Sequence, residues 1–177
     1  MRIIAGKLGG RYFAPPRGHR THPMSDKARG GLFNALGDLE GLTILDAFAG
    51  SGALSFEAVS RGAASSLAVE IDRLAHDAIT AGIAELELSG QVKAVRANTS
   101  SWSDNNPDVQ FDVVIAAPPY DNLQHKLVQK LARHTKNGGL YVLDWPKDVS
   151  LPEYSDLELI SHKPYGDATL AFYRKIS

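Results

Sequence analysis

Two stretches of the sequence combine glycines and carboxylates in a pattern that could hold a nucleoside. "LDAFAGSGAL", residues 45–54, places Gly50 and Gly52 between an apolar run and a helix-like segment. Glycines let a backbone approach a ligand closely, and a helix N-terminus offers free N–H groups. Glu70 follows Asp46 by 24 residues and lies where the next apolar run ends. A carboxylate there can accept hydrogen bonds from both ribose hydroxyls, so the pair predicts a nucleoside cofactor.

The glycine loop departs from two other phosphate-binding patterns. No Gly-Lys-Ser/Thr follows it, and Ser55 stands where a G-x-G-x-x-G fingerprint needs its third glycine. A dinucleotide-dependent oxidoreductase, which would also need a separate substrate domain, is therefore the weaker alternative. The third apolar run ends in "RANTSSW", where Asn98 could bond the edge of an adenine ring or could simply be a turn residue.

Basic residues concentrate at the start of the chain. Residues 1–29 hold seven basic groups and one acid, whereas the other 148 residues hold 12 basic and 19 acidic groups. A basic arm on an acidic body favours binding to a polyanion, most commonly nucleic acid, although a solvated loop is the alternative. The predicted RNA contacts are Arg2, Lys7, Arg11, Arg17, Arg20, Lys27 and Arg29.

The elements that must position these residues alternate between strands and helices. Residues 2–16 predict a hairpin turning at Gly9-Gly10 or at Gly6-Lys7, and Ser25 predicts the N-cap of a helix that Gly30-Gly31 weaken. Helices are predicted up to Arg61 and over 73–88 and 122–135. Seven strands are predicted over 42–48, 66–72, 92–97, 111–117, 138–145, 157–163 and 169–175.

This order predicts an α/β fold built on a doubly wound, mostly parallel, seven-stranded Rossmann-like sheet. An N-terminal β-hairpin precedes the sheet, and the strands joined by "PYGD" give it an antiparallel C-terminal edge. Ligands are expected at the carboxyl ends of the strands. The expected organisation is a basic hairpin and linker over residues 1–22 and one domain over 23–177.

Composition excludes several classes of chemistry. The 177 residues include no cysteine, so disulfides, thiolate catalysis and sulfur-ligated zinc are excluded, and the six histidines show no metal-ligand spacing. No apolar run reaches membrane-spanning length, and the N-terminus has no signal-peptide core. We therefore expect a cytoplasmic protein with no metal and no membrane partner.

The motifs together resemble a known family. "DAFAGSGAL" with "VEID" is similar to the S-adenosylmethionine site of class I methyltransferases. The wider pattern resembles the RsmD family, bacterial 16S ribosomal RNA guanine-N2 methyltransferases, through "RIIAGKLGGR", "DKARGGLFNAL", "LDAFAGSGALSFEAVSRGA", "FDVVIAAPPY" and "YGDATLAFY". The resemblance covers nearly the whole chain. It implies S-adenosylmethionine as cofactor, a monomer, and one guanine of 16S rRNA as target, in the small subunit or its assembly intermediate.

The resemblance also implies roles for individual residues. Asp46 would hold the cofactor's ammonium group through water, and Met24 and Ser25 would close over the cofactor. The remaining implied contacts are Phe48, Ala49, Gly50 and Gly52 for the methionine part, Glu70 and Ile71 for the ribose, and Asn98 and Thr99 for the adenine.

The target site is expected at "AAPPY", where this sequence departs from the family. In the resembling enzymes an Asp or Asn and the next proline carbonyl accept the two amine hydrogens, and an aromatic ring stacks on an unpaired or flipped base. Pro118, Pro119 and Tyr120 fit, but Ala117 has no acceptor. Asp121 could replace it. Otherwise Ala117 indicates a weakened enzyme, an inactive rRNA-binding protein, an engineered change, or only a structural turn.

Overall fold

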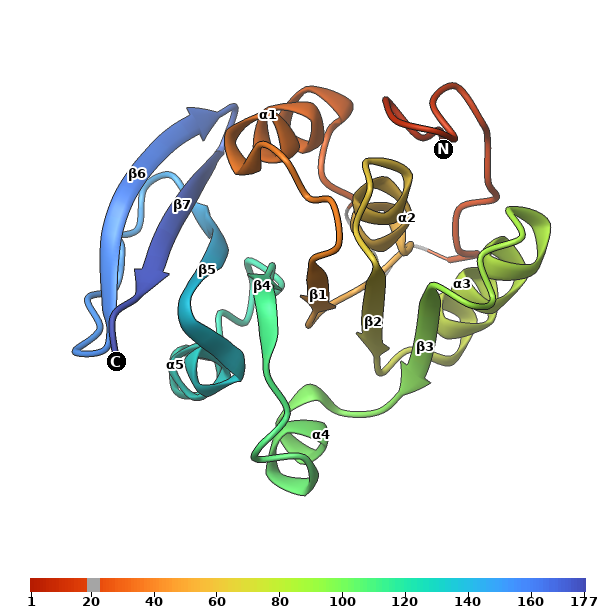
Figure 1. Cartoon of the computed structure of the whole chain (residues 1–177). Coiled ribbons are helices and arrows are strands. Elements are labelled where there is room, and N and C mark those ends of the chain that lie inside the picture. The colour runs from red at the N-terminus through yellow and green to blue at the C-terminus, as the bar shows by residue number, and fades with distance from the viewer. Residues whose placement is uncertain (19–22) are drawn as a thin grey trace.

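The strands form one mixed sheet that confirms the predicted fold class. The computed structural model describes residues 1–18 and 23–177, and its seven strands lie in the order β3-β2-β1-β4-β5-β7-β6 (Figure 1). The first five pair in parallel, and β7 pairs antiparallel with both of its neighbours, β5 and β6. They are β1 (Thr43–Asp46), β2 (Ser65–Glu70), β3 (Val92–Arg96), β4 (Phe111–Ala116), β5 (Thr135–Pro146), β6 (Leu157–Tyr165) and β7 (Ala168–Lys175).

Helices cover both faces of this sheet. Three lie on one face and two on the other (Figure 1). The first group is α1 (Asp26–Leu36), α2 (Ala53–Ser60) and α3 (Arg73–Glu85), and the second is α4 (Thr99–Asn105) and α5 (His125–Leu131), which continues as a 3₁₀ turn, Ala132–His134. Within residues 1–18 and 23–177, no helix is both long and apolar enough to cross a bilayer.

Two helices differ from the prediction. The sequence pattern predicted no helix at α4, because "TSSWSDN" has low helix propensity and one large apolar residue. The helix forms because the Asn98 side chain caps it and Trp102 is buried against the sheet. The predicted helix over 122–135 begins only at His125 and tightens into the 3₁₀ turn at its end.

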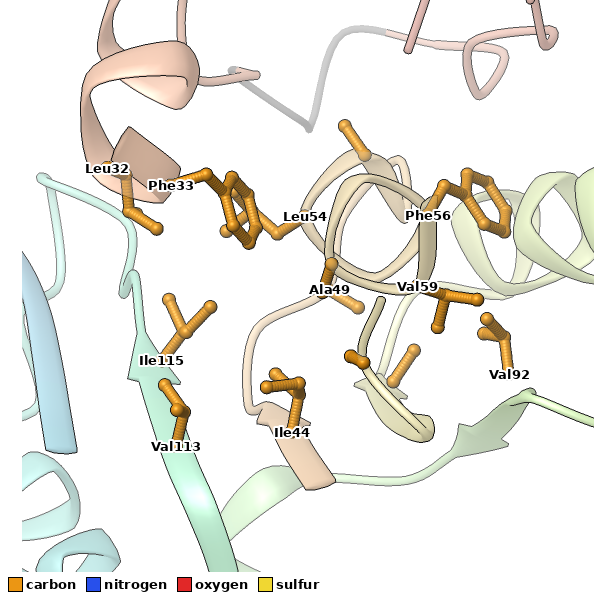
Figure 2. Packing of buried hydrophobic residues seen from close by; sticks show 14 of the residues in the cluster. Leu32, Phe33, Ile44, Ala49, Leu54, Phe56, Val59, Val92, Val113 and Ile115 are labelled. Carbon is orange, nitrogen blue, oxygen red and sulfur yellow. The ribbon is translucent and has the colours of Figure 1, made fainter. Parts of the chain in front are cut away.

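The first core cluster fills the space between α1–α3 and the sheet. It includes Leu32 and Phe33 of α1 and Phe56 of α2, packed over the strand residues Ile44 and Ile115 (Figure 2). The weak "GG" step of α1 has a packing reason. A Cβ added at Gly31 would lie 2.0 Å from the hydroxyl oxygen of Tyr165, so the helix depends on tertiary contact at this point.

The second core cluster lies under α4 and α5. It contains Trp102 of α4 and Leu127 and Leu131 of α5, packed on strand residues such as Tyr141 and Leu143. Along β4 and β5 the residues alternate between the two clusters, as the pleat of a sheet requires.

A buried histidine links α4 to the start of β5. His134 Nδ1 lies 2.6 Å from the carbonyl oxygen of Val109, and Nε2 lies 2.7 Å from the Ser103 hydroxyl oxygen. A carbonyl can only accept, so Nδ1 carries the hydrogen and Nε2 accepts from Ser103. The imidazole is therefore neutral in this network, and burial lowers the pKa of His134.

Acidification is expected to destabilise the protein through His134. Below about pH 6.5, the ordinary histidine value, the unfolded chain binds a proton that the folded chain resists, so the free energy of unfolding falls as pH falls. Denaturant titrations at pH 8 and pH 5.5 should show a larger loss for wild type than for His134→Gln. Other titrating groups are common to both proteins. Exposed His162→Gln is the control and should keep the wild-type pH dependence. An equal loss of unfolding free energy between pH 8 and pH 5.5 in wild type and His134→Gln would refute the neutral state of His134.

The N-terminal segment forms a turn that docks on α2. The predicted hairpin is present as one antiparallel bridge, Arg2 to Tyr12, rather than two regular strands. Gly6, at φ 85°, makes the turn, and a Cβ there would lie 2.0 Å from the carbonyl oxygen of Ser60. Ile3 and Phe13 belong to the first core cluster. The segment is therefore packed into the domain.

Arg29 is buried, which corrects its prediction as an RNA contact. Its side chain is 1% exposed, and Nε lies 3.6 Å from Oε1 of the fully buried Glu57. Its Nη2 donates to the carbonyl oxygen of Arg2 and to Asp26. Glu57 also accepts hydrogen bonds from the backbone N–H groups of residues 4 and 5 and from Arg61. Arg29 thus ties the N-terminal segment to α1 and α2.

Candidate functional site

The glycine loop turns from the carboxyl end of β1 into α2. Gly50 has φ 55° and Gly52 φ 81°, a left-handed conformation that side chains disfavour. Gly52 occupies the N-cap of α2 without a side-chain cap. A Cβ there would meet Ile79 at 3.1 Å and Phe56 at 3.2 Å. The loop therefore presents bare backbone at the edge where ligands bind in this class of sheet.

Asp46 is a buried carboxylate with one oxygen to spare. Its Oδ2 accepts from the Ser55 hydroxyl at 2.8 Å, and Ser55 in turn accepts from Ser66 at 2.9 Å. Its Oδ1 has no hydrogen-bond partner among the described residues. Burial raises the pKa of Asp46 to about 7; Ser55 opposes this shift and the charge of Glu70 adds to it. A positively charged group is the natural partner for such an oxygen.

Ser55 and Ser66 are site residues that the sequence patterns did not identify. Ser55 stands where a dinucleotide fingerprint would have its third glycine, so by sequence it marks only a departure from that pattern. In the structure the hydroxyl at this position orients Asp46. The available signal was a serine in the first turn of α2, nine residues after the strand-end acid Asp46.

Glu70 holds the glycine loop at the tip of β2. Its Oε2 accepts from the backbone N–H of Gly50 at 2.6 Å, and its Oε1 accepts from the N–H of Asp72 at 2.9 Å. Each carboxylate oxygen can accept a second hydrogen bond, so the ribose role remains open to it. Ile71 beside it is 60% exposed, and an exposed apolar side chain at this edge suits the cover of a flat ring.

The remaining predicted cofactor residues also have structural roles. The Asn98 Oδ1 accepts from the N–H of Ser101 at 3.1 Å, and the buried Thr99 hydroxyl donates to the carbonyl oxygen of Ala47 at 2.7 Å. The Ser25 hydroxyl caps α1. Met24 and Phe48 are half-buried against the first and second core clusters, and Ala49 is buried. Their cofactor contacts remain predictions.

The proposed target end follows β4. Pro118 is buried and Pro119 exposed, and Tyr120 is 39% exposed. The Tyr120 hydroxyl donates to Asp144 Oδ1 at 2.5 Å and lies 3.3 Å from the carbonyl oxygen of Trp145. The hydroxyl end of the Tyr120 ring is therefore held by β5, while part of the ring's surface remains accessible to solvent.

Asp144 is the third side chain that the sequence patterns missed. It lies near the carboxyl end of β5, and burial raises its pKa; the bond from Tyr120 opposes that shift and the charge of Asp167 adds to it. The pKa of Tyr120 is also raised, first by burial and then by Asp144. The signal was an acid near the end of the strand next to "AAPPY".

The basic residues of the N-terminal segment do not gather at this edge. The backbone N–H of Lys7 donates to Ser60 at the end of α2, and Arg11 donates to the Glu85 carbonyl at the end of α3. Lys7 and Arg11 line a hollow of about 420 Å³ together with residues one or two positions before the parallel strands β1, β2 and β3, namely Gly41, Ala64 and Gln91. This is the amino-end edge of the sheet, opposite the glycine loop.

The other predicted RNA contacts have mixed positions. Arg2 pairs with Asp26 at 3.3 Å, both half-exposed. Arg17 and Lys27 are exposed, and Arg20 lies outside the described residues. The described basic side chains therefore do not form one continuous patch with the glycine loop.

Comparisons with known proteins agree with this geometry. Residues 1–174 match the family described as Conserved hypothetical protein 95. "Putative rRNA methyltransferase YlbH" of Bacillus subtilis is 30% identical over 182 aligned residues, covering 99% of each chain. "Ribosomal RNA small subunit methyltransferase D" of Buchnera aphidicola is 32% identical over 145 residues, covering 79% of this chain and 75% of the relative. The solved structure titled "Putative methyltransferase yhhF from Escherichia coli" has a TM-score of 0.88 at 28% identity, covering 99% of this chain and 98% of that one.

Proposed function

The chain belongs to the RsmD family, described as Conserved hypothetical protein 95, and from that premise we propose that it is an S-adenosylmethionine-dependent methyltransferase of small-subunit ribosomal RNA. The fold is the class I methyltransferase fold. More specifically, we propose the exocyclic N2 of a guanine as the methyl acceptor. The observation that carries the proposed use of S-adenosylmethionine is the buried Asp46 beside the glycine loop and Glu70. One oxygen of Asp46 has no hydrogen-bond partner among the described residues.

These residues fit the proposed cofactor by their chemistry. Asp46 offers an ammonium group its Oδ1, which has no hydrogen-bond partner among the described residues, directly or through water, and the adjoining glycine loop lets a ligand approach the backbone closely. Glu70 offers both oxygens to ribose hydroxyls. When bound, S-adenosylmethionine supplies a methyl group on a sulfonium, which is already electrophilic, so the chain's own task is placement of the acceptor amine.

Tyr120 is suited to that placement. Its accessible ring offers a stacking surface for a base, and its pinned hydroxyl prevents the ring from swinging away. A guanine amine is a weak nucleophile because its lone pair is delocalised into the ring. Hydrogen-bond acceptors around the amine would aim that lone pair at the methyl group.

The test is labelled-methyl transfer to ribosomal RNA. Small subunits from cells lacking this protein should accept one methyl group per particle, and mass spectrometry of the digested RNA should locate it on N2 of a guanine. Naked 16S RNA and assembled particles in parallel distinguish the two substrate forms. Transfer to another atom would keep the proposed methyltransferase activity but refute guanine N2 as the acceptor. No transfer would refute the methyltransferase activity itself.

A second function is favoured by one residue. Ala117 lacks the acceptor that the family motif provides, so a protein that binds ribosomal RNA without modifying it is the alternative. RNA binding without transfer in the same assay would favour that alternative.

We also propose that Lys7 and Arg11 contact RNA phosphates, as the charge of residues 1–29 suggests. Replacing both with glutamine should reduce the slope of log affinity against log salt by roughly 0.7 per lost contact on single-stranded RNA. Truncation is a poor test because Ile3 and Phe13 lie in the core. Lys93→Gln, exposed on β3, is the control. An unchanged slope in the double variant would remove these residues from the RNA interface.

A further inference from the structure

The carboxylate missing at position 117 has a counterpart on the next strand. β4 and β5 pair in parallel with Ala116 opposite Leu143. Ala117 and Asp144 directly follow that pair, Ala117 just beyond the end of β4 and Asp144 within β5. We therefore infer that Asp144 lies near the position where the family motif has its acceptor. The adjacency depends on strand pairing and could not be read from the sequence, where the two residues are 27 positions apart.

Asp144 also lies on the face of the sheet that carries the cofactor residues. Val142 and Ile115 belong to the first core cluster, and Leu143 and Ala116 to the second. Alternation along a strand therefore returns Asp144 to the first face. Asp46 lies on the same face, since its partner Ser55 belongs to α2. An acceptor amine between the glycine loop and Tyr120 would thus meet Asp144 from the correct side.

The bond from Tyr120 leaves half of the carboxylate available. The phenol takes Oδ1 at 2.5 Å, which fixes the carboxylate's orientation. Among residues 1–18 and 23–177, Tyr120 gives the one hydrogen bond to the Asp144 side chain, so Oδ2 can serve as an acceptor near the tip of the ring on which the base would stack. Asp121, by comparison, is exposed on the turn after the ring.

We propose that Asp144 accepts a hydrogen bond from the target amine in place of the missing side chain at position 117. The proposal rests on the proposed function. As the amine nitrogen's lone pair forms the new N–C bond, the C–S bond breaks and its electron pair returns to sulfur. The extra proton on nitrogen passes to Asp144 Oδ2 and then to water, since Asp144 is only partly buried. A target without an N–H at this place leaves the carboxylate unpaired, so the site selects an amine.

Single-turnover transfer of labelled methyl to small subunits, at saturating cofactor, tests this role. Asp144→Ala should slow transfer about 10- to 150-fold, the rate equivalent of losing a hydrogen bond to a charged group, with unchanged cofactor affinity by calorimetry. Adding Ala117→Asp to that variant should raise its rate of methyl transfer at least tenfold. Asp148→Ala, an exposed acid just beyond β5, is the matched control and should keep the wild-type rate.

Tyr120→Phe separates direct contact from support of the ring. It removes the Tyr120 bond but keeps Asp144, so it should slow transfer less than Asp144→Ala does. Equal losses in these two variants, an unaltered rate in Asp144→Ala, or no recovery with Ala117→Asp would each overturn the inference. A loss in Asp121→Ala without one in Asp144→Ala would assign the acceptor to Asp121. No transfer by wild type would instead overturn the proposed function, and the inference with it.

Discussion

Replacing Glu57 with alanine is expected to lower the free energy of unfolding by about 3–5 kcal/mol, the usual cost of leaving one member of a buried ion pair alone. Glu57 is fully buried and faces Arg29, which is 1% exposed. It also accepts from the backbone N–H groups of Ile4 and Ala5 at 2.8 and 3.1 Å. The substitution therefore leaves the buried Arg29 guanidinium with only the half-exposed Asp26 as an ion-pair partner, and it releases the N-terminal turn from α2.

Equilibrium denaturation of the purified variant measures this loss. The matched control is Asp77→Ala, which removes an exposed pair with Arg73 at 3.6 Å and should cost no more than about 1 kcal/mol. Glu57→Gln should fall between wild type and Glu57→Ala because its amide oxygen can still accept a backbone N–H. A loss below about 1 kcal/mol in Glu57→Ala would show that this network does not hold the N-terminal segment.

Replacing Glu70 with alanine should weaken S-adenosylmethionine binding about 10- to 150-fold, corresponding to roughly 1.5–3 kcal/mol for hydrogen bonds to a charged group. Two effects contribute. The ribose loses its proposed acceptor, and the N–H of Gly50 loses the partner that holds it at 2.6 Å. The second effect loosens the loop on which the methionine part would rest.

Calorimetry with S-adenosylmethionine and S-adenosylhomocysteine measures the affinity. Glu85→Ala, an exposed glutamate at the end of α3 on the opposite edge of the sheet, should bind both normally. 2′-Deoxy and 3′-deoxy cofactor analogues isolate the ribose effect, because wild type should discriminate against them and Glu70→Ala should not. Equal affinity of wild type and Glu70→Ala would exclude the ribose contact.

The local motifs were predictable from the sequence because their causes are local. Ser25 caps α1 as predicted, since a hydroxyl there reaches an N–H three residues ahead. The glycine loop and Glu70 meet because consecutive parallel strands place their carboxyl ends at one edge. The antiparallel C-terminal hairpin followed from a short turn between two strands.

The sequence did not predict where a side chain lies when its position depends on a distant neighbour. Arg29 was predicted to contact RNA because it belongs to the basic arm. Its side chain is instead buried in an ion pair with Glu57, 28 residues later. Lys7 and Arg11 shared that arm, yet the N-terminal turn carries them to the edge opposite the glycine loop. Net charge along a segment says nothing about which face of the fold each group reaches.

The sequence by itself determined the fold class, the seven strands along the chain and the glycine loop, because hydrophobic periodicity, capping and turn chemistry act within a few residues. It also showed that the side chain at position 117 has no hydrogen-bond acceptor. Only the tertiary structure decided what surrounds that alanine. The pairing of Ala116 with Leu143 brings the following residues, Ala117 and Asp144, to the same edge, and the Tyr120 hydroxyl fixes the Asp144 carboxylate. Such a pairing is set by the packing of the whole sheet between its two layers of helices.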